Sequence, residues 1–298
     1  MKYLISIVGP TSIGKTNLAV EVAHLYNCDI ISADSRQFYK EMSIGTAKPS
    51  PEEMDGITHH FVDFISVEQS FSAGKFEEEA VQRIKELHSS NPVVVMVGGS
   101  GLYINAVLNG IDPIPSNQAI REELSDTLKK KGIALLQNEL LEKDPEHYRA
   151  MDINNPQRLI RALEVCRHTG STYTSFRTKE IKARPFEIIK IGLTANRDTI
   201  YERINTRVDD MLKQGLLEEV KALQEVRHLN ALQTVGYKEL FEHLDGKTEL
   251  QAAVGNIKMN TRRFAKRQLT WFKKDNEIHW FDIEDRTSAV NFLKSLTD

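Results

Sequence analysis

The chain contains 298 residues, carries a formal net charge of −3 and has two cysteines, Cys28 and Cys166. This length suits one large domain, or one domain with a sizeable insertion, and the small net charge does not decide nucleic-acid binding. Two cysteines without a C-x-x-C pattern argue against a disulfide framework or a zinc site, so we expect free thiols in a reducing compartment. The apolar run after Lys2 is broken at Gly9-Pro10, which argues against a signal peptide or membrane span and favours a cytoplasmic protein without a membrane partner.

A phosphate-binding loop is predicted between the first strand and the first helix. The apolar run 3–8 precedes a G-x-x-x-x-G-K-T sequence, and a helix-forming stretch follows it at 18–23, which is the context that this motif requires. The glycines allow a tight turn whose backbone N–H groups point inward, Lys15 adds a positive charge, and Thr16 offers a hydroxyl to a divalent metal such as Mg²⁺. We therefore expect a ligand that carries a pyrophosphate, bound by Gly9, Pro10, Thr11, Ser12, Ile13, Gly14, Lys15 and Thr16.

Short β-branched runs recur along the chain and predict a mostly parallel sheet. Helical patterns separate these runs, which lie at 3–8, 30–32, 92–97, 188–193 and 278–283. The segment 93–97 is apolar at every position, as expected for a central strand covered on both faces. The predicted fold is an α/β class, a P-loop NTPase-like, mostly parallel sheet flanked by helices.

Polar residues follow two of these predicted strands. Asp34 comes just after the strand 30–32, and Gly98-Gly99-Ser100-Gly101 follows the strand 92–97. Because open α/β sheets bind ligands at the carboxyl ends of their strands, we expect Asp34 to face Lys15, with Ser100 hydrogen-bonding Asp34 or a substrate amine. Two alternatives remain: Asp34 caps a following helix, and the glycines form only a tight turn.

Two adjacent histidines, His59 and His60, lie near Asp63. Their side chains would point to opposite faces of a strand, which disfavours a shared metal site. We expect a structural or substrate-positioning role.

A helical insertion is predicted at 113–185. Strand signals stop after the proline-rich stretch 113–115 and resume beyond Arg184-Pro185, and both boundaries disfavour continued helix. The core domain would then comprise 1–112 and 186–298. Within the insertion, Arg158 and Arg161 lie one helical turn apart and form a candidate basic site.

The segment 258–274 contains seven basic residues and no acid. At helical spacing, Ala265, Leu269 and Phe272 would face the core, while Arg263, Arg267 and Lys274 would share the other side. A solvated helix face is the alternative, but such faces ordinarily mix charges of both signs. We therefore predict that this helix contacts a nucleic acid.

The motifs together closely resemble the tRNA dimethylallyltransferases, also called tRNA isopentenyltransferases, over nearly the whole chain. The resemblance rests on Gly9 to Thr16, Asp34 to Tyr39, Thr46 to Pro49, His59-His60, Gly98 to Tyr103, Pro156 to Val165, Val235 to Tyr237 and Thr261 to Trp271. It implies transfer of a dimethylallyl group from dimethylallyl pyrophosphate to N6 of the adenosine immediately 3′ of a tRNA anticodon, with Mg²⁺. A monomer is expected.

The resemblance also implies roles for individual residues. Asp34 would be the general base, assisted by Ser100, Lys15 and Arg207, and the insertion 113–185 would grip the anticodon stem. The tRNA-binding residues would be Asp34, Ser35, Arg36, Gln37, Ser100, Arg121, Gln157, Arg158, Leu159, Ile160, Arg161, Gln233, Thr234, Val235, Gly236, Tyr237, Lys238, Arg262, Arg263, Lys266 and Arg267.

Departures from the family pattern are few. Ile13 replaces a small residue, Ser100 stands where threonine is frequent, and Asn155 replaces an aspartate. The zinc finger of eukaryotic relatives is absent, which suits the bacterial type. A small-molecule or nucleotide kinase, which shares the ATP-binding type of loop, is the alternative function, and a non-enzymatic RNA-binding module would leave Asp34 and Ser100 without a purpose.

Overall fold

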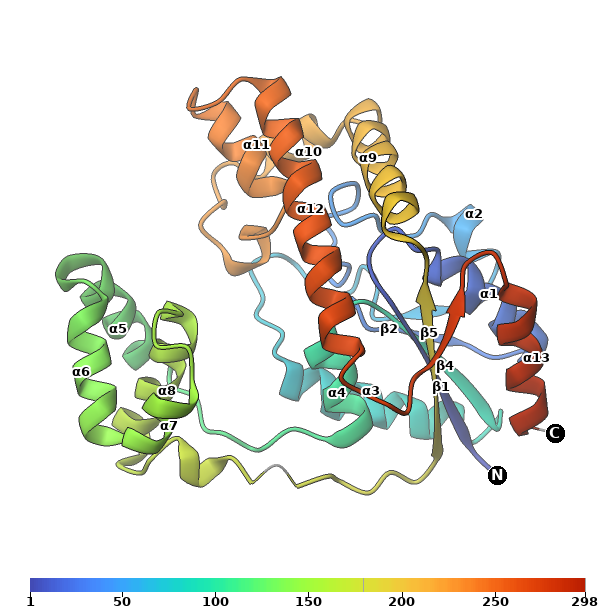
Figure 1. The fold of residues 1–298 in the computed structure, drawn as a ribbon, viewed down its shortest axis with the longest axis horizontal. Helices are drawn as coiled ribbons and strands as arrows, with labels where there is room; N and C mark the ends of the chain where they lie inside the picture. Colours follow the sequence, from blue (N-terminus) through green and yellow to red (C-terminus); the bar gives the residue numbers. More distant parts are fainter. Residues whose placement is uncertain (179, 298) are drawn as a thin grey trace. The chain divides into compact units, whose positions relative to one another are not determined.

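The computed structural model describes residues 1–178 and 180–297, which form two compact units (Figure 1). The core unit consists of Met1–Asn109 and Ala183–Asp298, and the helical unit of Gly110–Lys182. The predicted insertion, 113–185, begins and ends three residues later than the helical unit. Among the described helices, none has both the length and the apolar character needed to cross a membrane.

A six-stranded sheet lies at the centre of the core unit, in the order β3-β2-β4-β1-β5-β6. Every pair of neighbouring strands is parallel, so the predicted sheet is confirmed. The short β3 was not among the predicted runs, because two residues are too few for a periodic signal. The strands are β1 (Tyr3–Val8), β2 (Ile30–Ser32), β3 (His59–His60), β4 (Val93–Val97), β5 (Glu187–Thr194) and β6 (His279–Asp282).

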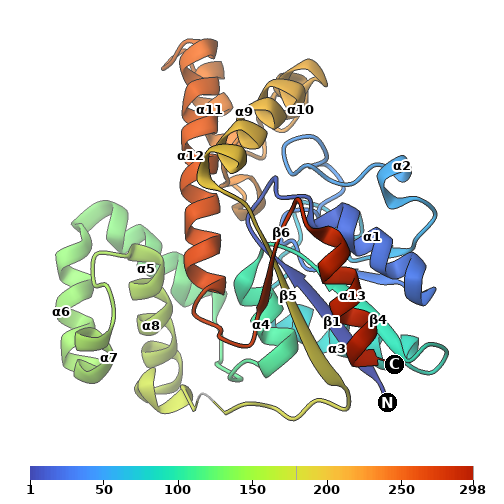
Figure 2. The same ribbon diagram turned by 45° about the vertical axis from the view of Figure 1, so that its right-hand side comes forward.

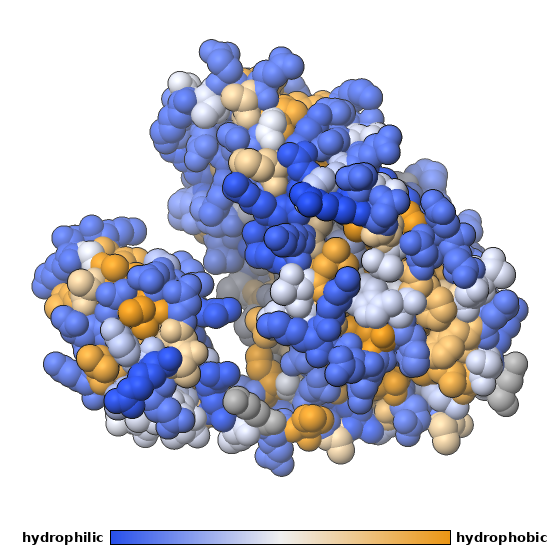
Figure 3. Space-filling model, in the orientation of Figure 1, coloured by the Kyte–Doolittle hydropathy of each residue, from blue (hydrophilic) through white to orange (hydrophobic). Residues whose placement is uncertain are grey.

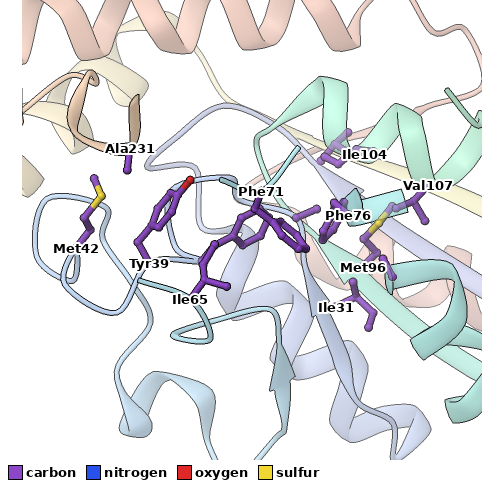
Figure 4. Packing of buried hydrophobic residues seen from close by; sticks show 14 of the residues in the cluster. Ile31, Tyr39, Met42, Ile65, Phe71, Phe76, Met96, Ile104, Val107 and Ala231 are labelled. Atoms are coloured by element: carbon purple, nitrogen blue, oxygen red, sulfur yellow. The ribbon is translucent and has the colours of Figure 1, made fainter. Parts of the chain in front are cut away.

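Helices cover both faces of this sheet, as Figure 2 shows. Successive side chains of a strand point to opposite faces, and accordingly Leu4 and Ile5 belong to two different hydrophobic clusters. One cluster includes α3 (Ala73–Leu87) and α4 (Gly101–Asn109), where Figure 4 shows Met96 of the sheet beside Phe76 and Val107. The other includes α1 (Lys15–Tyr26) and α13 (Arg286–Thr297).

Apart from the short α2, the remaining helices of the core unit lie in its C-terminal half. The longest described helix, α12, runs unbroken from Leu250 to Phe272 (Figures 1 and 2) and packs against α9, α11 and α4. It contains most of the predicted basic segment. The other helices are α2 (Pro51–Met54), α9 (Arg197–Lys213), α10 (Leu216–Ala222), η2 (Asn230–Leu232) and α11 (Tyr237–Leu244).

The helical unit has a small hydrophobic core of its own, built from leucines, one isoleucine and one alanine. A buried carboxylate, Glu164, is satisfied there by Arg121, by Arg161 and by the backbone N–H of Asn117. The unit comprises α5 (Gln118–Lys131), α6 (Ile133–Lys143), α7 (Pro145–Ala150), α8 (Pro156–Thr169) and η1 (Thr174–Phe176).

Candidate active site

The phosphate loop connects the end of β1 to the start of α1, as the sequence predicted. Gly9 has φ +149°, and a Cβ there would lie 2.7 Å from the carbonyl oxygen of Leu193, so only glycine fits. Gly14 is left-handed at the N-cap of α1 and places no side-chain cap over the helix N-terminus. The first N–H groups of α1 thus remain available to an anion, which the helix dipole also favours.

Lys15 lies in the first turn of α1, and its Nζ donates to the carbonyl oxygen of Pro10 at 2.7 Å. Burial lowers the pKa of Lys15 to about 8; Asp34 opposes this shift and Arg207 adds to it. Lys15 and Asp34 also line the same cavity, in keeping with the expectation that they lie near each other. An arriving phosphate would stabilise the charged amine that burial disfavours.

Arg207 enters the same region from α9. Burial lowers its pKa, Glu53 and Asp34 raise it, and Arg203 lowers it. The guanidinium stays charged in a protein, so Lys15 and Arg207 form a pair of cations with Asp34 as their nearby anion. Such an arrangement suits a ligand that brings several negative charges.

Asp34 follows β2, and its Oδ1 accepts the backbone N–H of Arg36 at 3.0 Å. This contact caps a turn that does not continue into a helix, so the alternative in which Asp34 caps a following helix is wrong. The same carboxylate also lines two adjoining cavities, so the capping contact does not hide it from a ligand. The catalytic role of Asp34 stays a prediction at this point.

Ser100 contacts Ser35 and not Asp34. Its Oγ accepts the backbone N–H of Ser35 at 2.9 Å and donates to the Ser35 hydroxyl at 3.1 Å. The expectation of a Ser100–Asp34 hydrogen bond is corrected accordingly: Ser100 steadies the turn that carries Asp34. A Cβ at Gly98 would lie 2.2 Å from the Ala33 carbonyl oxygen, so this glycine permits the two strand ends to approach.

Two adjoining cavities have several lining residues in common, among them Thr11, Asp34, Arg207 and Gln268. The phosphate cavity, of about 900 Å³, is lined by the phosphate loop and by polar side chains such as Lys48. The apolar cavity, of about 430 Å³, has walls that include Leu102, Tyr103, Val208, Met211, Phe264 and Trp271. Asp34 is thus placed where a charged ligand and an apolar one meet.

Residues 35–37 include side chains that hydrogen-bond to distant parts of the backbone and side chains that line a cavity. The Arg36 guanidinium donates to the carbonyl oxygens of Asn230 and Ala231, and the Gln37 amide donates to those of Thr46 and Ala47. These bonds fasten the turn to η2 and to the loop at 46–47. Ser35 and Arg36 nevertheless line the apolar cavity.

The predicted segment 233–238 is only partly available to a ligand. Thr234, Val235 and Gly236 line the apolar cavity. Tyr237 is fully buried and donates its hydroxyl to Glu219, so its inclusion among the tRNA contacts is wrong. Gln233 and Lys238 are exposed, and the Gln233 amide donates to the Arg227 carbonyl oxygen.

Some basic side chains of α12 are exposed, and others are held by an ion pair or a hydrogen bond to α9. Arg263, Lys266 and Arg267 are exposed, and Figure 3 shows strongly hydrophilic side chains over this part of the core unit. Lys258 pairs with Asp209, and Arg262 donates to Asn205, so the predicted unopposed charge is wrong at Lys258. Lys274 lies beyond the end of the helix. The free basic face is therefore narrower than the sequence suggested.

In the helical unit, some of the predicted tRNA-binding residues are buried or paired, and others are exposed. Leu159 and Ile160 are buried in the hydrophobic core, so a direct contact by either is wrong. Arg161 pairs with Glu164 and donates to the carbonyl oxygens of Ile114 and Pro115. Arg121 pairs with Glu164, although its side chain remains 44% exposed. Gln157 and Arg158 are exposed and available to a ligand.

The histidine pair has structural partners. His60 Nε2 lies 2.9 Å from Asp29 Oδ2, and His59 Nδ1 lies 3.0 Å from the Ile57 carbonyl oxygen. His59 also lines the phosphate cavity. Among residues 1–178 and 180–297, no group of three or more His, Cys, Asp or Glu could hold a metal ion.

The oxygen donors of the phosphate cavity fit an Mg²⁺ ion that the protein and a phosphate ligand hold together. Mg²⁺ keeps several waters and usually takes one or two protein oxygens together with substrate phosphates. Thr16 lines the phosphate cavity from the first turn of α1, and Asp34 lies in the same cavity. These residues could therefore support a phosphate-bound Mg²⁺ without a dedicated protein cage.

Two residues of this region escaped the sequence analysis. Gln268 on α12 is buried and reaches the phosphate loop, and Glu219 accepts the backbone N–H groups of Ser43, Ile44 and Gly45. A polar residue at a core position of an amphipathic helix was the available signal for Gln268, since buried polar groups need partners. Glu219 carries no such local signal, because its partners lie far away in the chain.

Comparison with known proteins gives a consistent result. Residues 37–275 match the family model described as IPP transferase. A tRNA dimethylallyltransferase of Christiangramia forsetii is 52% identical over 97% of this chain and 96% of its own length. A solved tRNA isopentenylpyrophosphate transferase from Bacillus halodurans is 39% identical, with a TM-score of 0.74 over 99% of this chain and 96% of that one. A solved eukaryotic dimethylallyltransferase acting on tRNA is 26% identical, with a TM-score of 0.78 over 96% of this chain and 75% of that one.

Proposed function

Because the chain belongs to the tRNA dimethylallyltransferase family and transfers a dimethylallyl group to tRNA, we propose that dimethylallyl pyrophosphate is the donor and N6 of the adenosine 3′ to the anticodon the acceptor. The observation that carries this proposal is the position of Asp34, which lines both the phosphate cavity and the apolar cavity. A carboxylate at that junction can meet the acceptor amine while the pyrophosphate occupies the loop.

The reaction joins N6 to the allylic carbon and breaks the bond from that carbon to the pyrophosphate oxygen. An exocyclic adenine amine is a weak nucleophile, so the enzyme must hold it in line with the carbon and remove its proton as the new bond forms. Asp34 accepts this proton, and Ser100 holds the turn that carries Asp34. The dimethylallyl group lies against the apolar cavity, whose walls include the buried side chains of Val208 and Phe272.

The leaving pyrophosphate gains negative charge as the carbon–oxygen bond breaks. The N–H groups at the N-terminus of α1, together with Lys15 and Arg207, stabilise that charge. Mg²⁺, when bound through Thr16 and the phosphates, would add further neutralisation. Most of the required charge stabilisation thus comes from groups already in place around the loop.

The tRNA binds through exposed basic side chains. Arg263, Lys266 and Arg267 offer phosphate contacts on α12, and Arg158 offers one on the helical unit. The target adenine must leave the stack of the anticodon loop, which costs a few kcal/mol. Phosphate contacts offset this cost. Because tRNA is its substrate, the enzyme works in the cytoplasm. A monomer is sufficient for the reaction, because one chain supplies all the groups named above.

The direct test is mass spectrometry of nucleosides from unmodified tRNA incubated with the enzyme, Mg²⁺ and dimethylallyl pyrophosphate. We expect N6-dimethylallyladenosine at the position 3′ to the anticodon, and no need for ATP. ATP consumption that depends on an acceptor would instead indicate the kinase alternative. A reaction with dimethylallyl pyrophosphate that modifies another nucleoside would refute the proposed acceptor.

Replacing Arg263 with alanine should weaken tRNA binding for all substrate tRNAs and reduce the salt dependence, because a single phosphate contact is lost. The plot of log Kd against log salt should flatten by about one unit of slope. Lys258→Ala is the matched comparison, since Lys258 is paired with Asp209 and should change the slope less. Equal slopes for wild type and Arg263→Ala would make Arg263 a bystander.

Pyrophosphate affinity should fall as the pH rises through about 8, because Lys15 loses its proton there. Bound pyrophosphate favours the charged amine and raises its pKa back towards the ordinary value, so affinity declines above the pKa of Lys15 in the free enzyme. Calorimetry with inorganic pyrophosphate from pH 6.5 to 9.5, a range of about one and a half units on each side of that value, measures this effect. Lys15→Met controls for the ionisation of pyrophosphate itself, and a variant whose profile matches that of wild type would contradict the assignment.

A further inference from the structure

Gln268 connects helix α12 to two loops that line the cavities. Its side-chain Oε1 accepts the backbone N–H of Thr11 at 2.8 Å, and its Nε2 donates to the carbonyl oxygen of Gly99 at 2.9 Å. The residue is only 6% exposed. Both polar atoms of this buried amide are therefore used, and each bonds to the backbone of a different loop.

These two loops follow neighbouring strands. Thr11 belongs to the phosphate loop after β1, Gly99 belongs to the loop after β4, and β1 pairs with β4. A Cβ at Gly99 would lie 2.3 Å from the Gln268 Nε2 and 3.8 Å from the Lys15 Nζ. Gly99 thus lacks a side chain where the amide approaches, and the amide lies close to the phosphate-binding lysine.

A carboxamide carries both the acceptor and the donor that these two contacts need. Methionine has a similar length but neither a strong donor nor a strong acceptor, and glutamate could accept from Thr11 but could not donate to Gly99. On α12, Arg267 directly precedes Gln268, and Arg263 lies five residues earlier, both exposed. Helix α12 therefore exposes basic side chains to solvent and also contacts the phosphate loop through the buried Gln268 side chain.

We propose that Gln268 is a positioning residue that anchors the phosphate loop to helix α12 and holds this loop in the conformation that accepts pyrophosphate. This inference rests on the proposed function for the identity of the ligand. The amide orients the Thr11 peptide, and with it the adjoining loop N–H groups, before the ligand arrives. Such preorganisation reduces the cost of ordering the loop on binding.

The experiment compares Gln268→Met and Gln268→Glu with wild type and with Thr270→Ala, an exposed control on the same helix whose hydroxyl donates to the Lys266 carbonyl oxygen. Inorganic pyrophosphate affinity is measured by calorimetry, and exchange of the Thr11 amide is followed by NMR. For Gln268→Met we expect an affinity about tenfold weaker, as two hydrogen bonds are lost, and faster Thr11 exchange. The tRNA affinity should change less than about twofold, and Thr270→Ala should match wild type.

Gln268→Glu tests the two contacts separately. It should keep Thr11 protected, lose the Gly99 contact, and bind pyrophosphate more weakly than Gln268→Met because of its negative charge. Pyrophosphate affinity within about twofold of wild type in either variant would overturn the inference, as would tRNA and pyrophosphate affinities that fall equally. Neither measurement uses prenyl transfer, so the inference can fail while the proposed acceptor stands, and the reverse.

Discussion

Asp34→Asn should lower turnover by roughly 10² to 10⁴-fold while tRNA binding persists. Asparagine has the same shape and can still accept the Arg36 N–H through its side-chain oxygen, so the turn after β2 should remain. What is lost is the basicity needed to take the proton from N6. Single-turnover rates at saturating tRNA and dimethylallyl pyrophosphate measure this loss directly.

Asp29→Asn provides a matched control for the Asp34 variant. Asp29 lies just before β2, where it contacts His60, and it lines neither cavity. Its replacement should leave the single-turnover rate within about twofold of wild type, since Asp29 lines neither cavity and asparagine can still hydrogen-bond His60. Near-normal turnover by Asp34→Asn would eliminate Asp34 as the general base.

Arg207→Met should reduce turnover by about 10² to 10³-fold, which is the typical effect of removing one preorganised group that stabilises charge in the transition state. Methionine keeps much of the apolar stem that packs in α9 but removes the guanidinium from both cavities. The rate of the chemical step should fall for every tRNA substrate. Rapid-quench measurement of pyrophosphate release gives that rate.

Arg197→Met is the control on the same helix. Arg197 is exposed at the start of α9, where its guanidinium lies 4.9 Å from the centre of the Tyr201 ring, and it lines neither cavity. It should therefore leave the chemical step unchanged. Similar rate losses in the two arginine variants would mean that Arg207 acts through helix stability and not on the pyrophosphate.

The local features of this protein were predictable from its sequence. The phosphate loop is one contiguous stretch between a strand and a helix, so its residue spacing alone indicates its geometry. The parallel sheet follows from the repeated strand and helix signals, and Asp34 follows from the rule that ligands bind at carboxyl strand ends. Each of these inferences depends only on residues close together in the chain.

Predictions of exposure were less reliable. The basic segment 258–274 contains no acid, yet its first residue, Lys258, pairs with Asp209 of another helix. Motif position likewise suggested tRNA contacts at Leu159 and Tyr237, which lie in hydrophobic cores. Sequence spacing gives the face of a helix, but it does not say which distant element covers that face.

The sequence by itself determined the phosphate loop, the order of strands and helices, and the reaction class that their ordered motifs resemble. Only the tertiary structure decided which charges remain free, that Ser100 bonds to Ser35, and that Gln268 ties α12 to Thr11 and Gly99. The physical reason is that backbone conformation and hydrophobic periodicity are short-range properties. Burial, ion pairing and hydrogen-bond partners depend instead on residues that folding brings together, such as Thr11 and Gln268, 257 positions apart.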